Sequence, residues 1–305
     1  MLENKMDNPL SKTSERKPHH FIVGGVPEHF NLPWHLARES GGFSEAGIRV
    51  DWQDFHGGTG ALNKALREGE IDIAVVLTEG IIADMHRGNP SSIVQIYIQS
   101  PLIWGIHVGE ESKFMEPDDL QGGTYSISRY GSGSHLISFV DAMQRGWDIG
   151  AQKFKVVGNL EGALEALTKG NADCLLWEKF TTKPYVDSGI VRRIGEVHTP
   201  WPCFVMAVRN DRLQEDKIQV SQLCKVIQAY SKDFMSNENA KAMVAERYKL
   251  LPEDVEQWYN ATRWAVSNEI PNKAIDQTIN TLFELGLIDY KMKPEELIAS
   301  PGILC

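Results

Sequence analysis

The pattern A-L-x-x-G-x-x-D occurs twice in this sequence, and it constrains the fold more than any other feature. It spans Ala65–Asp72 and again Ala166–Asp173. Both copies are typical of a helix end, a turn at glycine and the entry to a strand. An apolar run and then a glutamate, Glu79 or Glu178, follow each copy. The repeat favours two lobes built on one plan, although so common a helix ending can also recur by chance.

Short apolar runs alternate with helical stretches, and the alternation starts twice. The runs of the first series are Phe21–Val26, Ile48–Trp52, Ile71–Leu77 and Ile93–Ile98. Those of the second series are Thr124–Ser128, Phe154–Val157 and Cys174–Trp177. Strands that alternate with helices predict parallel sheets with βαβ crossovers. A strand at Phe204–Val208 is expected to return to the first lobe, and the chain after it is expected to be mostly helical to Leu297.

The predicted fold class is therefore α/β, with two βα lobes, a ligand cleft between them and a helical C-terminal segment. Residues 20–106 and 208–305 are expected to form the first lobe, and residues 107–207 the second. Residues 1–19 are polar and have no hydrophobic periodicity, so we expect a disordered lead-in that is removable up to about Lys17.

The charge of the chain excludes some partners. The net charge is −10 and the pI is about 5.4, so the surface would repel phosphate backbones and nucleic acid is not an expected partner. No apolar run approaches the roughly 18–20 residues that span a bilayer. The first residues contain no apolar signal-peptide core, which predicts a cytoplasmic protein as written, or a periplasmic one if a leader has been removed. Cys174 and Cys203 lie in apolar runs and are expected to be buried thiols.

Several short segments resemble the solute-binding components of ABC importers for sulfonates, taurine and thiamine-pyrimidine precursors. The segments are Gly57–Leu62 (GGTGAL), Leu66–Ala74 (LREGEIDIA), Leu120–Thr124 (LQGGT) and Gly131–Ser134 (GSGS). The family usually has a lysine where this chain has Gly123. Its relatives, the thiamine-pyrimidine synthases, carry a cysteine-rich motif, and here Trp201–Phe204 supplies one cysteine. The resemblance implies a bilobed fold of the type II periplasmic-binding-protein kind, with two hinge crossings and a ligand in the cleft.

Ligands of open α/β sheets bind beyond the carboxyl ends of the strands, so the loops there hold the candidate residues. In the first lobe, helix N-termini and capping residues could bind an anion, and carboxylates could bind an amine. These candidates are Glu28, His29, Asn31, Trp34, His56, Gly58, Thr59 and Glu79. Each has a structural alternative, since Thr59 could only cap a helix and Trp34 could only pack in the core.

The second lobe and the expected crossings supply the other candidates. Arg129 precedes a glycine-rich turn, where its guanidinium could hold an anion or simply lie on the surface. Tryptophans near strand ends could stack on a flat ligand, or else pack in the core. The candidates are Trp104, Arg129, Tyr130, Ser132, Gly133, Ser134, Asn159, Trp177 and Trp201. We interpret Glu178 as a carboxylate that is favoured by a helix dipole rather than as a ligand residue.

Two classes of function fit these features. The first is a solute-binding protein that captures an anionic, zwitterionic or aminopyrimidine-like small molecule, with an ABC permease as a possible partner. The second is a cytoplasmic enzyme on the same bilobed fold, similar to some thiamine- or menaquinone-pathway enzymes. No nucleophile elbow, P-loop, HExxH or EF-hand motif occurs, so the sequence predicts no catalytic cluster, no metal and no cofactor.

Overall fold

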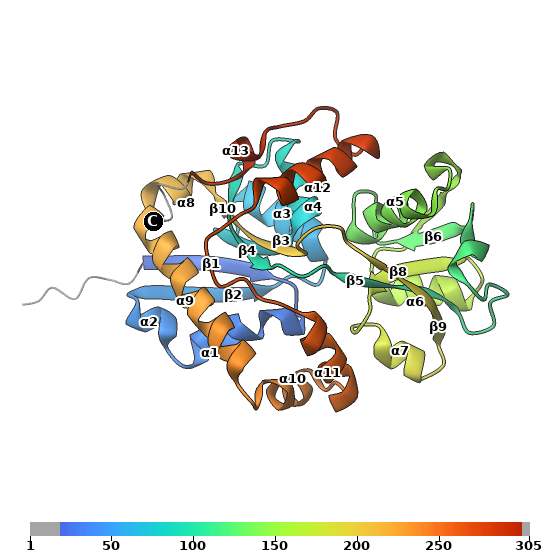
Figure 1. The fold of residues 1–305 in the computed structure, drawn as a ribbon, viewed down its shortest axis with the longest axis horizontal. Helices are drawn as coiled ribbons and strands as arrows, with labels where there is room; N and C mark the ends of the chain where they lie inside the picture. Colours follow the sequence, from blue (N-terminus) through green and yellow to red (C-terminus); the bar gives the residue numbers. More distant parts are fainter. Residues whose placement is uncertain (1–18, 301–305) are drawn as a thin grey trace, which may run out of the picture.

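The computed structural model describes residues 19–300, which form two five-stranded sheets side by side along the molecule (Figure 1). The first sheet has the strand order β2-β1-β3-β10-β4. Its strands are β1 (His19–Gly25), β2 (Ile48–Asp54), β3 (Ile73–Leu77), β4 (Ser91–Ile98) and β10 (Phe204–Arg209). The predicted lead-in lies outside the described residues, except for His19, which already belongs to β1.

The second sheet has the strand order β7-β6-β8-β5-β9. Its strands are β5 (Ile103–Gly109), β6 (Thr124–Ile127), β7 (Lys153–Val156), β8 (Cys174–Glu178) and β9 (Val191–His198). Sequence patterning missed β5 and β9. The β9 strand carries Arg192, Arg193 and Glu196 at the edge of the sheet, where polar side chains reach water and no apolar run is needed.

The predicted parallel pairing holds for β1, β2 and β3 and for β6, β7 and β8, but each sheet is mixed. Strand β10 runs antiparallel to β3 and β4, and β5 runs antiparallel to β8 and β9. The chain changes sheet through the short segments 99–102 and 199–203. If β5 or β10 ran parallel to its neighbours, a longer connection would have to carry the chain to the opposite end of the sheet first. Both segments come a few residues earlier in the sequence than the expected lobe boundaries at 106/107 and 207/208, and those boundaries remain predictions.

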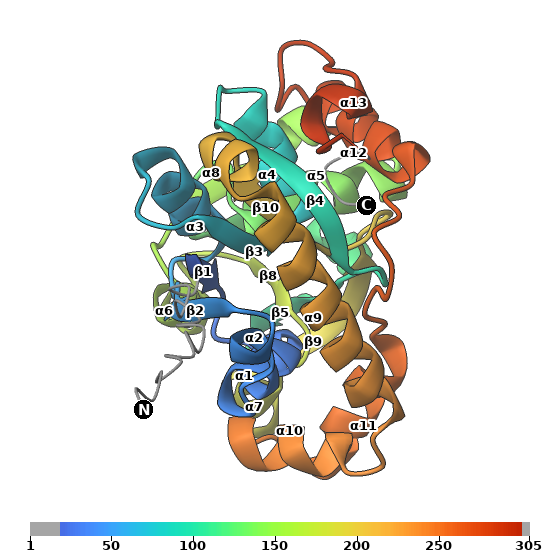
Figure 2. The ribbon, with the colours of Figure 1, turned by 90° about the vertical axis from the view of Figure 1, so that its left-hand side faces the viewer.

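The helices cover the sheets and mostly belong to the first lobe (Figures 1 and 2). Those of the first lobe are α1 (Leu32–Glu39), α2 (Gly42–Glu45), α3 (Gly58–Glu68), α4 (Thr78–Met85), α8 (Asn210–Glu215), α9 (Lys217–Ser236), α10 (Ala240–Tyr248), α11 (Pro252–Ala261), α12 (Asn272–Glu284) and α13 (Pro294–Leu297). The second lobe has α5 (Gly133–Arg145), α6 (Leu160–Thr168) and α7 (Lys183–Asp187). Within the described residues no helix is both long and apolar enough to cross a bilayer.

The repeated sequence pattern corresponds to the same contact in both lobes. Asp72 follows α3, and its carboxylate accepts a hydrogen bond of 2.9 Å from the Ile22 backbone N–H of β1. Asp173 follows α6, and its carboxylate accepts one of 2.8 Å from the Thr124 backbone N–H of β6. The strands that these aspartates precede, β3 and β8, pair in parallel with β1 and β6. The two lobes therefore share one βαβ plan.

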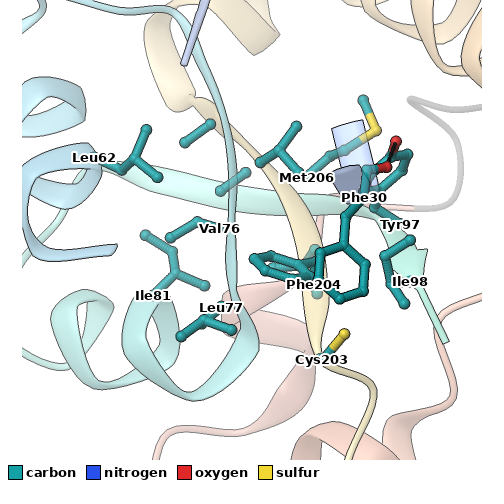
Figure 3. Packing of buried hydrophobic residues seen from close by; sticks show 14 of the residues in the cluster. Phe30, Leu62, Val76, Leu77, Ile81, Tyr97, Ile98, Cys203, Phe204 and Met206 are labelled. Carbon is teal, nitrogen blue, oxygen red and sulfur yellow. Dashed lines mark hydrogen bonds between the residues drawn. The ribbon is translucent and has the colours of Figure 1, made fainter. Parts of the chain in front are cut away.

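The core of the first lobe extends to the segment that returns from the second lobe. Phe204, at the start of β10, packs against Phe30 with ring centroids 5.3 Å apart (Figure 3). Leu77 and Cys203 lie beside them in the same view. The predicted burial of the Cys174 and Cys203 thiols is confirmed. Apolar burial at this point fixes where β3 ends and the return crossing meets the first sheet.

Candidate functional site

A cavity of about 310 Å³ lies where the two lobes meet. Both sheets contribute to its walls, because it is formed at the ends of β1, β2, β3, β6, β7 and β8, at the starts of β5 and β10, and by the first crossing. Its lining residues are Val26, Pro27, Glu28, Phe55, His56, Gly57, Gly58, Thr59, Leu77, Leu102, Trp104, Ser128, Arg129, Ser132, Gly133, Ser134, Gly158, Asn159, Leu160, Glu161, Trp177, Glu178, Thr181 and Phe204. A cavity of this size suits a small organic molecule.

The first lobe contributes a carboxylate and a glycine-rich helix start. Glu28 follows β1 and lines the cavity as a partly buried residue. Residues 56–59 follow β2 and lead into α3, with Gly58 in the left-handed region at φ 63°. No side chain caps this helix start, and the Gly58 N–H donates to the Phe55 carbonyl oxygen at 3.0 Å, which leaves the N–H groups after it available for hydrogen bonds.

The second lobe contributes a helix start of a different kind. Ser132 is the N-cap of α5, and its hydroxyl accepts a hydrogen bond from the His135 N–H and contacts the Ser134 hydroxyl. Asn159 caps α6 in the same way, because its side chain accepts from the Gly162 N–H. These side chains satisfy part of the helix ends that the sequence predicted as anion sites, so their capping role is visible in the structure.

Arg129 reaches from the second lobe to the first. Its Nη1 donates a hydrogen bond of 3.3 Å to the Gly57 carbonyl oxygen. Its guanidinium also lies against Gly60, where a Cβ atom would come within 1.7 Å of Nη2. Burial lowers the pKa of Arg129 from its usual value. The residue is therefore an interlobe contact whose guanidinium lies directly over Gly60.

Two carboxylates face the cavity from opposite lobes. Glu178 ends β8, and its Oε2 accepts hydrogen bonds from the Phe180 N–H, the Thr181 N–H and the Thr181 hydroxyl at 3.0, 2.6 and 2.8 Å. Burial, and then the charge of Glu178, raise the pKa of Glu28 to about 8. Burial also raises the pKa of Glu178. A protonated Glu28 beside an oriented Glu178 can donate or accept a proton near neutral pH.

The comparisons with known proteins point to one fold. A model of Ca3427-like PBP, a periplasmic-binding-protein family, matches residues 104–197. The CA3427 gene product of Candida albicans, described as defining a new family with the generic periplasmic binding protein fold, superposes with a TM-score of 0.83. It is 25% identical, and the match covers 90% of this chain and 92% of that chain. The chain has the fold of the periplasmic binding proteins. This result confirms the family resemblance inferred from the sequence.

Two transport proteins share this fold at lower identity. The alkanesulfonate-binding protein SsuA from Xanthomonas axonopodis pv. citri, bound to MOPS, has a TM-score of 0.78 and 15% identity over 93% of this chain and 99% of that one. The periplasmic nitrate-binding protein NrtA from Synechocystis PCC 6803 has a TM-score of 0.72 and 15% identity over 92% of this chain and 85% of that one. A search of curated protein sequences finds no match to this chain.

Most of the predicted ligand residues lie together in the cavity of this binding-protein fold. They are Glu28, His56, Gly58, Thr59, Trp104, Arg129, Ser132, Gly133, Ser134, Asn159 and Trp177. Strand-end loops of both lobes were expected to converge, and these residues come from such loops and from the first crossing. Whether each one binds a ligand remains a prediction.

Six predicted residues lie outside the cavity wall, and three of these follow β1. His29 is buried against Trp258, with ring centroids 4.2 Å apart, and burial lowers its pKa to about 3. Asn31 donates to the Val26 carbonyl oxygen at 2.8 Å, and Trp34 is buried in the core of the first lobe. These side chains support the Glu28 loop from behind because the short 3-10 turn at 29–31 directs them inward.

The other three lie near the return crossing and the mouth of the cavity. Glu79 is buried on α4, where its Oε2 accepts a 2.8 Å hydrogen bond from Nε1 of Trp201. Burial raises the pKa of Glu79 to about 7. Tyr130 is 65% exposed and contacts Phe154 edge-on. Glu79 and Trp201 thus form a contact between α4 and the crossing rather than part of the cavity wall.

Sequence reasoning missed several apolar lining residues and placed Glu178 outside the ligand set. The missed residues include Phe55, Leu77, Leu102, Leu160 and Phe204. The repeated pattern contained a signal for two of the lining positions. The position five residues after the aspartate lines the cavity in each lobe, as Leu77 after Asp72 and Glu178 after Asp173.

Proposed function

We propose that this protein reversibly captures one small organic molecule between its two lobes. The observation that carries this proposal is the cavity of about 310 Å³, whose wall is shared between the lobes. A ligand that contacts both lobes at once favours the closed arrangement over an open one, since closure adds contacts from the second lobe. Solute-binding relatives with the same fold support this reading.

The cavity wall suits a molecule with a flat apolar part and polar ends. Phe55, Trp104, Trp177 and Phe204 provide aromatic surface. Uncapped N–H groups at the start of α3 and the hydroxyls at the start of α5 provide polar contacts. Transfer of the bound molecule to an ABC-type permease is part of the proposal, because structural neighbours that share the fold are named as components of such import systems.

The most direct test is native mass spectrometry of the purified protein, followed by identification of any released molecule. We expect one small molecule per chain. Adding it back to stripped protein should change tryptophan fluorescence, because Trp104 and Trp177 line the cavity. A Trp177→Phe variant, with Trp147→Phe as a control away from the cavity, should lose part of that signal. Absence of any retained or rebinding molecule would contradict ligand capture.

The two cavity carboxylates favour a second candidate, an enzyme on the same bilobed fold. Glu28, with its pKa raised to about 8, faces the oriented Glu178 and could transfer protons as a general acid and base. Prolonged incubation of the identified molecule with the protein separates the two functions. A binding protein returns the molecule unchanged, whereas an enzyme converts it at a rate that Glu28→Gln abolishes.

A further inference from the structure

The charged side chains around the cavity are mostly acidic. Glu28, Glu161 and Glu178 line it, whereas Arg129 is the only lysine or arginine among the lining residues that the structure describes. The Arg129 guanidinium already donates to the Gly57 carbonyl oxygen. The neighbouring Lys179 is paired with Glu196 at 2.8 Å and does not line the cavity. The cavity is therefore electrostatically suited to a cation.

Glu28 and Glu178 line the cavity together, and Glu79 lies outside its wall beside the return crossing. Burial, and then the charges of Glu79, Glu178 and Glu28, raise the pKa of Cys203, so all three carboxylates are close enough to act on the buried thiol. Glu79 is held by Trp201, and Glu178 is held by three donors from residues 180 and 181. No hydrogen bond or ion pair within the described residues holds the Glu28 carboxylate.

The aromatic surface beside these carboxylates restricts the shape of the ligand. Trp104 near the start of β5 and Phe204 at the start of β10 lie directly after the two crossings, and Trp177 adjoins Glu178. Trp104 is only 5% exposed, and its indole Nε1 is buried without a hydrogen-bond partner in the described structure. Aromatic faces attract cations as well as flat rings, so they favour a cationic ligand, as the carboxylates do.

We propose that the cavity selects a flat molecule with a protonated nitrogen group, an amine or amidine, which binds between Glu28 and Glu178. This inference rests on the proposed function, since it names the ligand class of the same site. It also sets this protein apart from the relatives whose names give an alkanesulfonate or nitrate as ligand, because a negative ligand would meet the acidic pair.

Binding of such a cation should release a proton. With its pKa at about 8, Glu28 is mostly protonated at pH 7 in the empty cavity. A bound cation favours the ionised carboxylate and lowers that pKa, so the proton leaves as the ligand enters. Affinity should therefore rise with pH up to about 8 and then level off. The other ionisable groups that face the cavity are His56, Arg129, Glu161 and Glu178.

The test uses three flat probes of nearly equal size and different charge, namely benzamidine, benzamide and benzoate. Isothermal titration calorimetry of the stripped, full-length protein measures their affinities. We expect benzamidine to bind at least tenfold more tightly than the other two, from a charge-assisted contact of about 1.5–3 kcal/mol. Titration in two buffers with different ionisation enthalpies should show release of close to one proton at pH 7, and of almost none above about pH 9.

Isosteric variants locate the effect. Glu28→Gln should remove both the preference for benzamidine and the proton release. Glu178→Gln should weaken benzamidine binding and shift the pH at which proton release ends downward, because one source of the raised pKa is lost. Glu45→Gln, at an exposed position on α2, is the matched control and should change neither quantity. Circular dichroism verifies that each variant folds, and the proton count on the wild-type protein needs no variant.

Each outcome has a separate meaning for the two proposals. Equal binding of the three probes, tighter binding of benzoate or binding without proton release would overturn the cation proposal and leave ligand capture standing. A copurified molecule without a basic nitrogen would do the same. Failure of benzamidine to bind also overturns the cation proposal, and if no molecule copurifies either, ligand capture is contradicted as well.

Discussion

The two lobes of this protein use one backbone plan with different side chains at the cavity. Asp72 and Asp173 accept a backbone N–H from the first strand of their lobe at nearly the same distance, 2.9 and 2.8 Å. Five residues later the chain reaches the cavity in both lobes, with Leu77 on one side and Glu178 on the other. The comparison teaches that the βαβ plan selects which positions face the ligand, while the residue type at each position sets the chemistry.

The starts of α3 and α5 differ in a similar way. Gly58 of α3 adopts φ 63° and has no atom within 4 Å of where a Cβ would lie. Gly133 of α5 has an ordinary φ, but a Cβ there would lie 2.7 Å from the Trp104 ring and 3.3 Å from Leu77 of the other lobe. One glycine is thus required by backbone conformation, and the other by close contacts with Trp104 of its own lobe and Leu77 of the other lobe.

The largest expected effect is on the pH dependence of stability, and it comes from the buried carboxyl group of Glu79 in the first lobe. Burial raises the pKa of Glu79 from 4.5 to about 7, so its contribution to stability is fully present below about pH 4.5. That contribution is lost as pH rises through 7, at a cost on the order of 3 kcal/mol. Glu79→Gln should flatten this part of the pH dependence, measured by urea unfolding from pH 4.5 to 8. Glu28, whose pKa is raised to about 8, accounts for the slope that remains, and a slope equal to that of the wild type would show that Glu79 contributes nothing to it.

The two aspartates of the repeat should differ in how much stability they provide. Asp72→Ala should lower the free energy of unfolding by about 2–3 kcal/mol and Asp173→Ala by about 1.5–2, since each removes a charged hydrogen-bond acceptor. The larger value is expected for Asp72, which also lies 3.4 Å from Arg212 and 3.9 Å from Arg209. Denaturant unfolding of both variants measures the difference. Equal losses or the reverse order would show that the two arginines add nothing to the contribution of Asp72.

Substitution of the two glycines should affect different properties, ligand binding in one case and stability in the other. Gly133→Ala should weaken ligand binding about tenfold, or 1.4 kcal/mol, because the rigid Trp104 ring must move before the lobes can close. Gly58→Ala should instead reduce stability by about 1–2 kcal/mol through its left-handed backbone. Calorimetric titration and thermal unfolding of both variants give the two quantities. If both variants lose affinity alone or stability alone, the two helix starts do not differ in the expected way.

The smallest effect is expected at the exposed mouth of the cavity. Tyr130 is 65% exposed and contacts the rings of His135 and Phe154 edge-on. Tyr130→Ala should change stability by less than about 0.5 kcal/mol and leave ligand affinity unchanged. A loss of affinity of tenfold or more would show instead that Tyr130 covers the bound ligand. The same titration that is used for Gly133→Ala measures it.

Local patterns in the sequence were enough to predict the two βα lobes and the loops that meet at the cavity. Apolar runs placed most of the strands, because a buried strand needs apolar side chains wherever it packs. Position after a strand predicted residues such as Glu28, Arg129 and Trp177, since loops at strand ends converge in this architecture. These properties are local, or follow from the order of elements along the chain.

Strand direction, and which side chains face the cavity, depend on the tertiary structure. Strands β5 and β10 run antiparallel to β8 and β3 because the chain crosses between the sheets through short segments. Glu79 was predicted in the ligand site, but it starts a helix and pairs with Trp201, while Glu178 ends its strand at the cavity. Which carboxylate faces the cavity depends on contacts between distant segments, and those contacts are absent from any local pattern.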